Sequence, residues 1–97
     1  MAKFDLEDRL VAFAGDVILF ANRVPSDYAG QYLKNQIIRS ASSTALNYGE
    51  ALGTESTKDA IHKNSIVLKE LKETRVNLKI LKYLEYEELE KRNRLHW

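Results

Sequence analysis

The chain has 97 residues, no cysteine, a single proline and a formal net charge of +1. This length predicts a single domain over residues 1–97, and the lack of cysteine excludes disulfide bonds, thiolate catalysis and zinc–sulfur sites. A charge this close to zero gives no global electrostatic argument for nucleic acid or for a membrane surface.

The amino-terminal part of the sequence predicts neither a membrane span nor a secretion signal. Its longest apolar stretch, LVAFAGDVILFA, contains Asp16 and is shorter than the roughly 20 residues that cross a bilayer. The preceding segment, MAKFDLEDRL, is acidic and lacks the basic-then-apolar order of a signal peptide. We therefore expect a cytoplasmic protein that does not contact membranes.

A first helix is predicted between Asp5 and Pro25. Asp5 is placed to cap its start, and Pro25 ends it because the residue before a proline is disfavoured in the helical conformation. The apolar residues between them step by three and four, which is the spacing of one helix face. This predicted core stripe consists of Leu6, Leu10, Phe13, Val17, Phe20 and Val24.

A second helix is predicted from Ser26, as its cap, to about Gly53. Its later half belongs to the stretch RSASSTALNYGEALGTES, residues 39–56, whose serines and glycines also suit a loop or a nucleophile-bearing turn. The stretch has no G-x-S-x-G motif, and its larger residues keep helical spacing. We therefore interpret its small residues as a surface for close helix packing.

A third helix is predicted to begin at Ser56 or Thr57. Its main apolar seam, again with spacings of four and three, consists of Ala60, Asn64, Val67, Leu71, Thr74, Leu78 and Leu81. A second apolar row on nearly the opposite side consists of Val76, Ile80 and Tyr83. Since a helix that is apolar on two sides is rarely at the surface of a monomer, either the third helix is central in the bundle or this row is a candidate oligomer interface.

The last thirteen residues, EYEELEKRNRLHW, are polar. Acid-first pairs four residues apart, such as Glu87 with Lys91, support a short exposed helix. The segment either continues the third helix or turns back near Glu85 and Tyr86. The predicted fold is thus an all-α, antiparallel up-and-down helical bundle with three long helices and a short or truncated fourth.

Four cations of the third helix form the best candidate binding surface. At 100° per residue they fall within about 80° of one another beside the apolar seam. This basic stripe consists of Lys72, Arg75, Lys79 and Lys82. Such a stripe can neutralise phosphates of nucleic acid. The simpler interpretation, favoured for a monomer, is a solvated flank partly paired with Glu70, Glu73 and acids of other helices, whereas a symmetric oligomer would repeat the stripe and favour binding.

Catalytic and metal sites have little support in the sequence. A conceivable carboxylate site contains Glu50, Glu55, Asp59 and His62. Bundle di-metal sites use paired Glu-x-x-His units, and the single comparable spacing here, Asp59 with His62, stands alone. We therefore expect capping and solvation for these residues, no cofactor or metal, and no small-molecule substrate.

Three segments resemble a known bacterial family: FDLEDRLVAFAGDVI, VPSDYAGQYLKNQIIRSASSTALNYGEA and ESTKDAIHKNSIVLKELKETRVNLKIL. The family consists of four-helix-bundle proteins first noticed in intervening sequences of the large ribosomal RNA gene, and it includes the accessory variability determinant of diversity-generating retroelements. The likeness spans residues 4–84. Its most recognisable motif includes five residues to which we assign a structural role: Arg39, Ser43, Asn47, Tyr48 and Glu50.

The resemblance implies an antiparallel bundle, a ring-shaped homopentamer and no enzymatic activity. It also implies two candidate partners, because the retroelement member, which is strongly basic, binds nucleic acid and a reverse transcriptase. Relatives have a longer fourth helix than the polar tail seen here. We therefore expect a non-enzymatic oligomeric scaffold that binds a macromolecular partner. The alternatives are a small metal-dependent hydrolase and a truncated element product without a present role.

Overall fold

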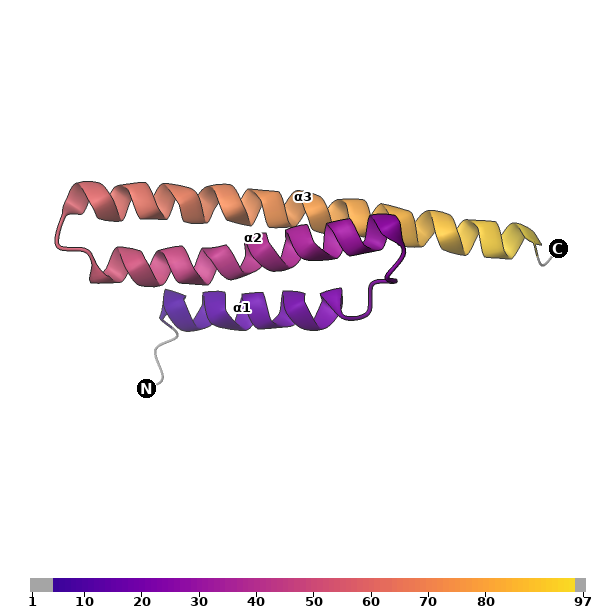
Figure 1. The fold of residues 1–97 in the computed structure, drawn as a ribbon, viewed down its shortest axis with the longest axis horizontal. Helices are drawn as coiled ribbons and strands as arrows, with labels where there is room; N and C mark the ends of the chain where they lie inside the picture. The colour runs from indigo at the N-terminus through magenta and orange to yellow at the C-terminus, as the bar shows by residue number, and fades with distance from the viewer. Residues whose placement is uncertain (1–4, 96–97) are drawn as a thin grey trace.

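Three α-helices make up the part of the chain that the computed structural model describes, namely residues 5–95 for the backbone and 5–85 for the side chains. They are α1 (Leu6–Ala21), α2 (Tyr28–Gly53) and α3 (Thr57–Leu95). Consecutive helices run in opposite directions, and α2 lies between α1 and α3 (Figure 1). Over these residues α2 packs against both neighbours, whereas α1 and α3 do not meet backbone to backbone. The predicted all-α antiparallel bundle is confirmed.

Helix α1 begins as predicted and ends earlier than predicted. The Asp5 carboxylate caps it by accepting a hydrogen bond from the Asp8 amide at 2.8 Å. The helix stops at Ala21, and the amides of Arg23 and Val24 donate to carbonyls three residues back, which tightens the chain into a turn before Pro25. The restriction that Pro25 places on its neighbour is thus absorbed by a short turn outside the helix.

The cap of α2 differs from the prediction, which placed it at Ser26. The N-cap is Asp27, whose carboxylate accepts a hydrogen bond from the Gly30 amide at 2.8 Å. The Ser26 hydroxyl instead accepts a hydrogen bond from the Lys34 ammonium at 3.0 Å. A carboxylate at a helix start also interacts favourably with the helix dipole, which a serine hydroxyl does not, and this favours Asp27.

The end of α2 and the start of α3 follow the prediction. Helix α2 ends at Gly53, and the Ser56 hydroxyl caps α3 by accepting a hydrogen bond from the Asp59 amide at 3.3 Å. Residues 39–53 are therefore the late half of a long helix, as interpreted from their spacing.

Small polar residues of α2 form a close contact with α3. Ser40, Thr44 and Thr74 are fully buried, and the Thr74 hydroxyl lies 2.7 Å from the Ser40 hydroxyl across the interface. The Ser40 and Thr44 hydroxyls also donate to carbonyls of their own helix, those of Ile37 and Ala41. Buried hydroxyls must be hydrogen-bonded, and these short side chains satisfy that need without separating the helices. A solvent-accessible nucleophile is therefore not formed at Ser40.

The core combines residues of all three helices at the end of the bundle where α1 passes into α2. Its buried members are Ala14, Val17, Ala21, Leu33, Ile37, Ala41 and Leu81, with Phe13, Phe20, Val24, Ile38 and Leu78 packed around them. Most of the stripe predicted for the first helix is thus in the core, whereas Leu6 at its start is 47% exposed. The seam predicted for the third helix is likewise buried or half-buried, except for the exposed Asn64.

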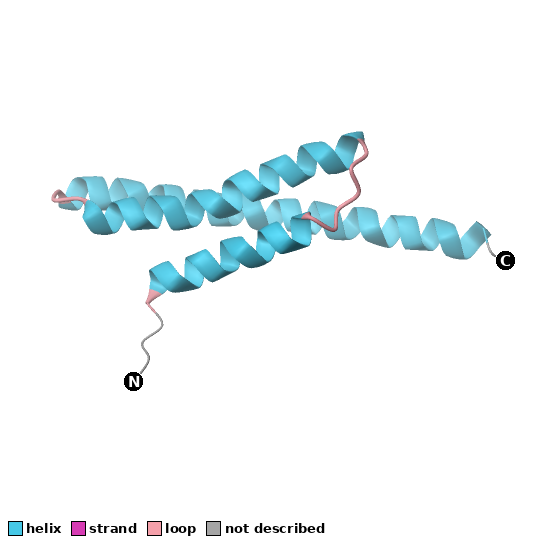
Figure 2. Cartoon of the chain, turned by 60° about the horizontal axis from the view of Figure 1, so that its bottom comes forward, coloured by secondary structure: helices cyan, strands magenta, loops and turns pink. Residues whose placement is uncertain are grey.

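Helix α3 is longer than the bundle that it packs against. Leu81 is its last buried residue among the described side chains, and the backbone remains helical to Leu95. The last turns extend past α1 and α2 in both views (Figures 1 and 2). The tail predicted as a short fourth helix, or as a continuation, is therefore the continuation of α3; its predicted ion pairs involve side chains outside the described residues. Over the described residues, none of the helices has the length and apolar character needed to cross a membrane.

Candidate nucleic-acid interface

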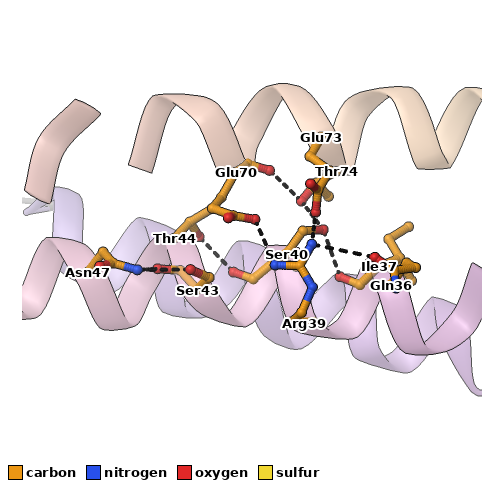
Figure 3. Close-up of polar contacts among 11 residues, drawn as sticks. Gln36, Ile37, Arg39, Ser40, Ser43, Thr44, Asn47, Glu70, Glu73 and Thr74 are labelled. Atoms are coloured by element: carbon orange, nitrogen blue, oxygen red, sulfur yellow. Dashed lines mark hydrogen bonds and ion pairs between the residues drawn. The ribbon is translucent and has the colours of Figure 1, made fainter. Parts of the chain in front are cut away.

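One side of α3 carries acids that face α2. The Arg39 guanidinium of α2 donates to the Glu70 carboxylate at 3.2 Å and to the Glu73 carboxylate, and it also reaches the Gln36 amide oxygen at 3.5 Å (Figure 3). Glu70 is only 8% exposed. A carboxylate this buried requires a cationic or hydrogen-bonding partner, and Arg39 supplies one from the neighbouring helix.

The other residues of the recognisable motif lie along the same α2–α3 boundary or beside it. The Asn47 amide donates to the Ser43 carbonyl and hydroxyl at 2.9 and 2.8 Å, within α2. Glu50 pairs with Lys63 of α3 at 2.5 Å, and Tyr48 is half-buried. The three ion pairs found among the described side chains all join α2 to α3. Two motif residues, Arg39 and Glu50, therefore take part in the contact between α2 and α3.

We expect the Arg39→Met variant to lower the free energy of unfolding by about 1 to 3 kcal/mol, because it leaves the Glu70 carboxylate buried without its cation. Adding Glu70→Gln removes the buried charge and should recover part of that loss. Urea unfolding followed by circular dichroism, arranged as a double-mutant cycle, measures the coupling. Additive effects of the two substitutions would show that the pair does not stabilise the α2–α3 contact.

The four residues of the basic stripe are all exposed, and three of them border one groove. This α1/α3 groove is open, has a volume of about 370 Å³, and lies between Phe13 of α1 and Leu71 and Leu78 of α3. Its cationic rim consists of Arg75, Lys79 and Lys82. The fourth cation, Lys72, is exposed on the same helix and does not line the groove. The groove thus has an apolar floor beside a row of positive charges.

The stripe is not neutralised by the acids that were expected to pair with it. Glu70 and Glu73 pair with Arg39 instead. Among the side chains of residues 5–85, none of the four stripe cations forms an ion pair with a carboxylate. The expected partial pairing of the stripe with these two acids is therefore not seen, and the four exposed cations fit both a solvated flank and a surface that binds an anion.

The acidic residues weighed as an enzyme site are not assembled into one. Glu50 is held by Lys63, and the Asp59 backbone amide is bound to the Ser56 cap. Over the described residues, no group of three or more histidine, aspartate and glutamate side chains lies close enough to hold a metal ion.

The second apolar row of α3 is open to solvent in the single chain. Val76, Ile80 and Tyr83 are 48%, 41% and 64% exposed, and Leu84 beside them is 44% exposed. Four neighbouring large apolar side chains at this exposure form a surface that favours coverage by another molecule. The predicted row is therefore exposed in the single chain.

Comparison with known proteins identifies the family. The model of the 23S rRNA-intervening sequence protein family matches residues 3–96, almost the entire chain. The chain belongs to this family. Searches of curated proteins and of solved structures gave no significant match. For this 23S rRNA-intervening sequence protein, the resemblance inferred from the three sequence segments is thereby confirmed.

The groove contains three residues that the sequence analysis assigned only to apolar core faces, Phe13 of α1 and Leu71 and Leu78 of α3. Phe13 of α1 is half-buried against the core and also forms one wall of the groove. Helical spacing places a residue on a face of its own helix and does not say which other helix lies across from it. No local sequence signal could have connected Phe13 with Arg75 and Lys79.

Proposed function

We propose that this protein is a non-enzymatic, oligomeric helical scaffold of the bacterial cytoplasm that binds nucleic acid. The observation that carries the proposal is that only one side of α3 packs against α2. That side packs on α2 through Arg39, Glu70 and the apolar seam. The remaining surface presents the basic stripe and the row of Val76, Ile80 and Tyr83.

Oligomerisation would bury the apolar row of Val76, Ile80 and Tyr83. Burying three such side chains against another copy removes apolar surface from water, which is favourable by about 25 cal/mol for each Å². A homopentameric ring, as implied by the family resemblance, would repeat the basic stripe around its axis. Repetition would raise the local density of positive charge although the net charge of each chain is only +1.

Nucleic acid is the partner that the stripe suits best. Each phosphate neutralised by a lysine or arginine releases bound counterions, so affinity from such contacts falls steeply with salt. Arg75 can hold a phosphate with two parallel hydrogen bonds, while the lysines act as point charges. Binding of this kind positions a nucleic acid backbone and does not read its sequence.

We expect replacement of all four stripe cations, Lys72, Arg75, Lys79 and Lys82, by glutamate to abolish retention of RNA. The substitutions change the formal net charge from +1 to −7, two units for each of four residues. A matched control variant makes the same charge change at four exposed cations outside the stripe: Arg9, Arg23, Lys58 and Lys69. Filter binding over a salt series compares the two variants with the wild type.

Loss of binding in the stripe variant alone supports the site. Equal loss in both variants would mean that binding depends on total charge. Unchanged retention by the stripe variant would refute the site and leave a protein partner, such as a reverse transcriptase, as the scaffold's target.

A further inference from the structure

The α1/α3 groove has its cations on one wall only. Arg75, Lys79 and Lys82 all belong to α3, and none of them forms an ion pair with a carboxylate among the described side chains. Arg75 and Lys82 are seven residues apart on the helix, so the row is about 10 Å long. A chain of phosphates that follows α3 would therefore meet three positive charges within two helical turns.

The opposite wall, formed by α1, carries the opposite charge. An adjoining hollow shares Phe13 with the groove and is also lined by Asp8, Arg9, Ala12 and Asp16. With two carboxylates and one guanidinium, this wall has a formal charge of −1, whereas the three cations of the α3 rim give +3. Asp8 and Asp16 are exposed, and neither forms an ion pair among the described side chains. An anion is thus attracted to α3 and repelled from α1.

This asymmetry fits a single strand of nucleic acid better than a duplex. A duplex has phosphates on both of its strands, so a duplex laid across the groove would bring phosphates to the carboxylates of α1 as well as to the cations of α3. An unpaired strand can instead present its phosphates on one side and splay its unstacked bases to the other. When its phosphates follow α3, its bases lie across the groove toward α1.

The floor of the groove offers such bases an apolar surface with an aromatic ring. Phe13, Leu71 and Leu78 are half-buried, so each packs into the bundle and keeps part of its side chain open to the groove. Proteins that bind single strands stack bases on aromatic side chains, largely without regard to which base it is. The groove volume of about 370 Å³ is at the lower end of the range for small-molecule sites, which suits an inserted base.

We propose that the α1/α3 groove binds unpaired RNA, with a base stacked against Phe13 and the adjacent phosphates held by Arg75, Lys79 and Lys82. Loops, bulges and ends of RNA regularly present bases that are unpaired and unstacked, whereas cellular DNA is mostly paired, and this favours RNA. The inference rests on the proposed function, because it uses the same cations. It adds the form of the nucleic acid and the direction in which its bases face.

The test compares a short labelled RNA as a single strand and as a duplex with its complement, by fluorescence anisotropy. We expect the wild type to bind the unpaired form at least about tenfold more tightly. Phe13→Leu keeps an apolar side chain and removes the ring, so it should weaken binding of the unpaired form about tenfold and leave binding of the duplex unchanged. Phe13→Tyr keeps the ring and should bind as the wild type does.

Phe20→Leu is the matched control. It makes the same change at another half-buried phenylalanine of α1, which packs against the core and does not line the groove. We expect this variant to bind both forms of the RNA as the wild type does. Equal losses in Phe20→Leu and Phe13→Leu would assign the effect to the core and overturn the proposal.

Two further results would also overturn it: a wild type that binds the duplex as tightly as the single strand, or a Phe13→Leu variant that binds the single strand as tightly as the wild type. Circular dichroism establishes that each variant is helical. If Phe13→Leu fails to fold, photocrosslinking of thiouridine-containing RNA to the wild type decides, with an adduct expected at Phe13; adducts confined to α3 would contradict the proposal.

Failure of this inference is distinguishable from failure of the proposed function. A wild type without preference for the single strand, combined with loss of all RNA binding when the four stripe cations are replaced by glutamate, would contradict only the inference drawn here. Unchanged RNA binding after those four replacements would refute the proposed nucleic-acid site and this inference together.

Discussion

Substitution of Gly30 by alanine is expected to destabilise the protein by about 3 kcal/mol or more, because the new methyl group has no room. Gly30 is buried in the first turn of α2, and a Cβ built on it overlaps the carbonyl oxygen of Pro25 and lies 2.9 Å from the Asp27 carboxylate. The obstacle at Pro25 is backbone, which cannot rotate away as a flexible side chain can. Relief requires moving the α1–α2 connection or releasing the Asp27 cap.

Gly15 provides the matched control for this prediction. It lies in the middle of α1, and a Cβ added there meets nothing within 4 Å. Alanine is favoured over glycine in a helix interior by about 1 kcal/mol, so Gly15→Ala should raise stability slightly. If the Pro25 contact is real, thermal and urea unfolding will show a lower stability for Gly30→Ala and a slightly higher stability for Gly15→Ala than for the wild type. A Gly30→Ala protein as stable as the wild type would show that the turn is not packed as described.

Substitution of Ile37 by alanine is expected to cost about 3 to 4 kcal/mol. Ile37 is fully buried in the middle of the core, where α2 meets residues of both other helices. Removing its three outer carbons leaves a cavity, since neighbours such as Val17 and Leu81 are fixed by their own helices. For a chain of this size that loss is a large part of the total stability.

The same substitution at Ile61 is the control, because it changes helix propensity in the same way without removing a buried side chain. Ile61 lies on α3 and is 65% exposed, so Ile61→Ala should change stability by no more than about 0.5 kcal/mol. The midpoint of urea unfolding compares the two variants directly. If Ile37→Ala were no more destabilising than Ile61→Ala, the three helices would not share the core described above.

The helices could be predicted from the sequence because their signals are local. The spacing of Leu10 and Val17 reflects the face that α1 buries, and the turn after Gly53 is marked by the capping serine at Ser56. The cap of α2 was misplaced by one residue because Ser26 and Asp27 are both good N-cap residues. Only the position of the Gly30 amide distinguishes them.

The extent of α3 could not be predicted in the same way. A polar segment with acid-first pairs is equally compatible with a continued helix and with a separate short one, since neither buries an apolar face of its own. The choice depends on whether the chain turns near Glu85, and no glycine or proline there marks a turn.

The sequence predicts that the candidate interface contains a row of cations. It does not predict which carboxylates lie beside those cations. Helical periodicity alone places Lys72, Arg75, Lys79 and Lys82 on one flank. Whether that flank is neutralised depends on Arg39, which lies 31 residues before Glu70 and 34 before Glu73. Pairing between residues so far apart in the sequence depends on how α2 and α3 pack. In the structure Glu70 and Glu73 pair with Arg39 of α2, and the four cations of the stripe are exposed.

The mass of the assembled protein in solution is the most direct test of the scaffold proposal. Light scattering and sedimentation equilibrium on the wild-type chain at micromolar concentration should give a discrete mass that is a multiple of the 11.2 kDa chain. That result is expected because α3 exposes Val76, Ile80 and Tyr83 together with a basic stripe that forms no ion pair among the described side chains. A well-folded monomer of 11.2 kDa under the same conditions would contradict the proposal.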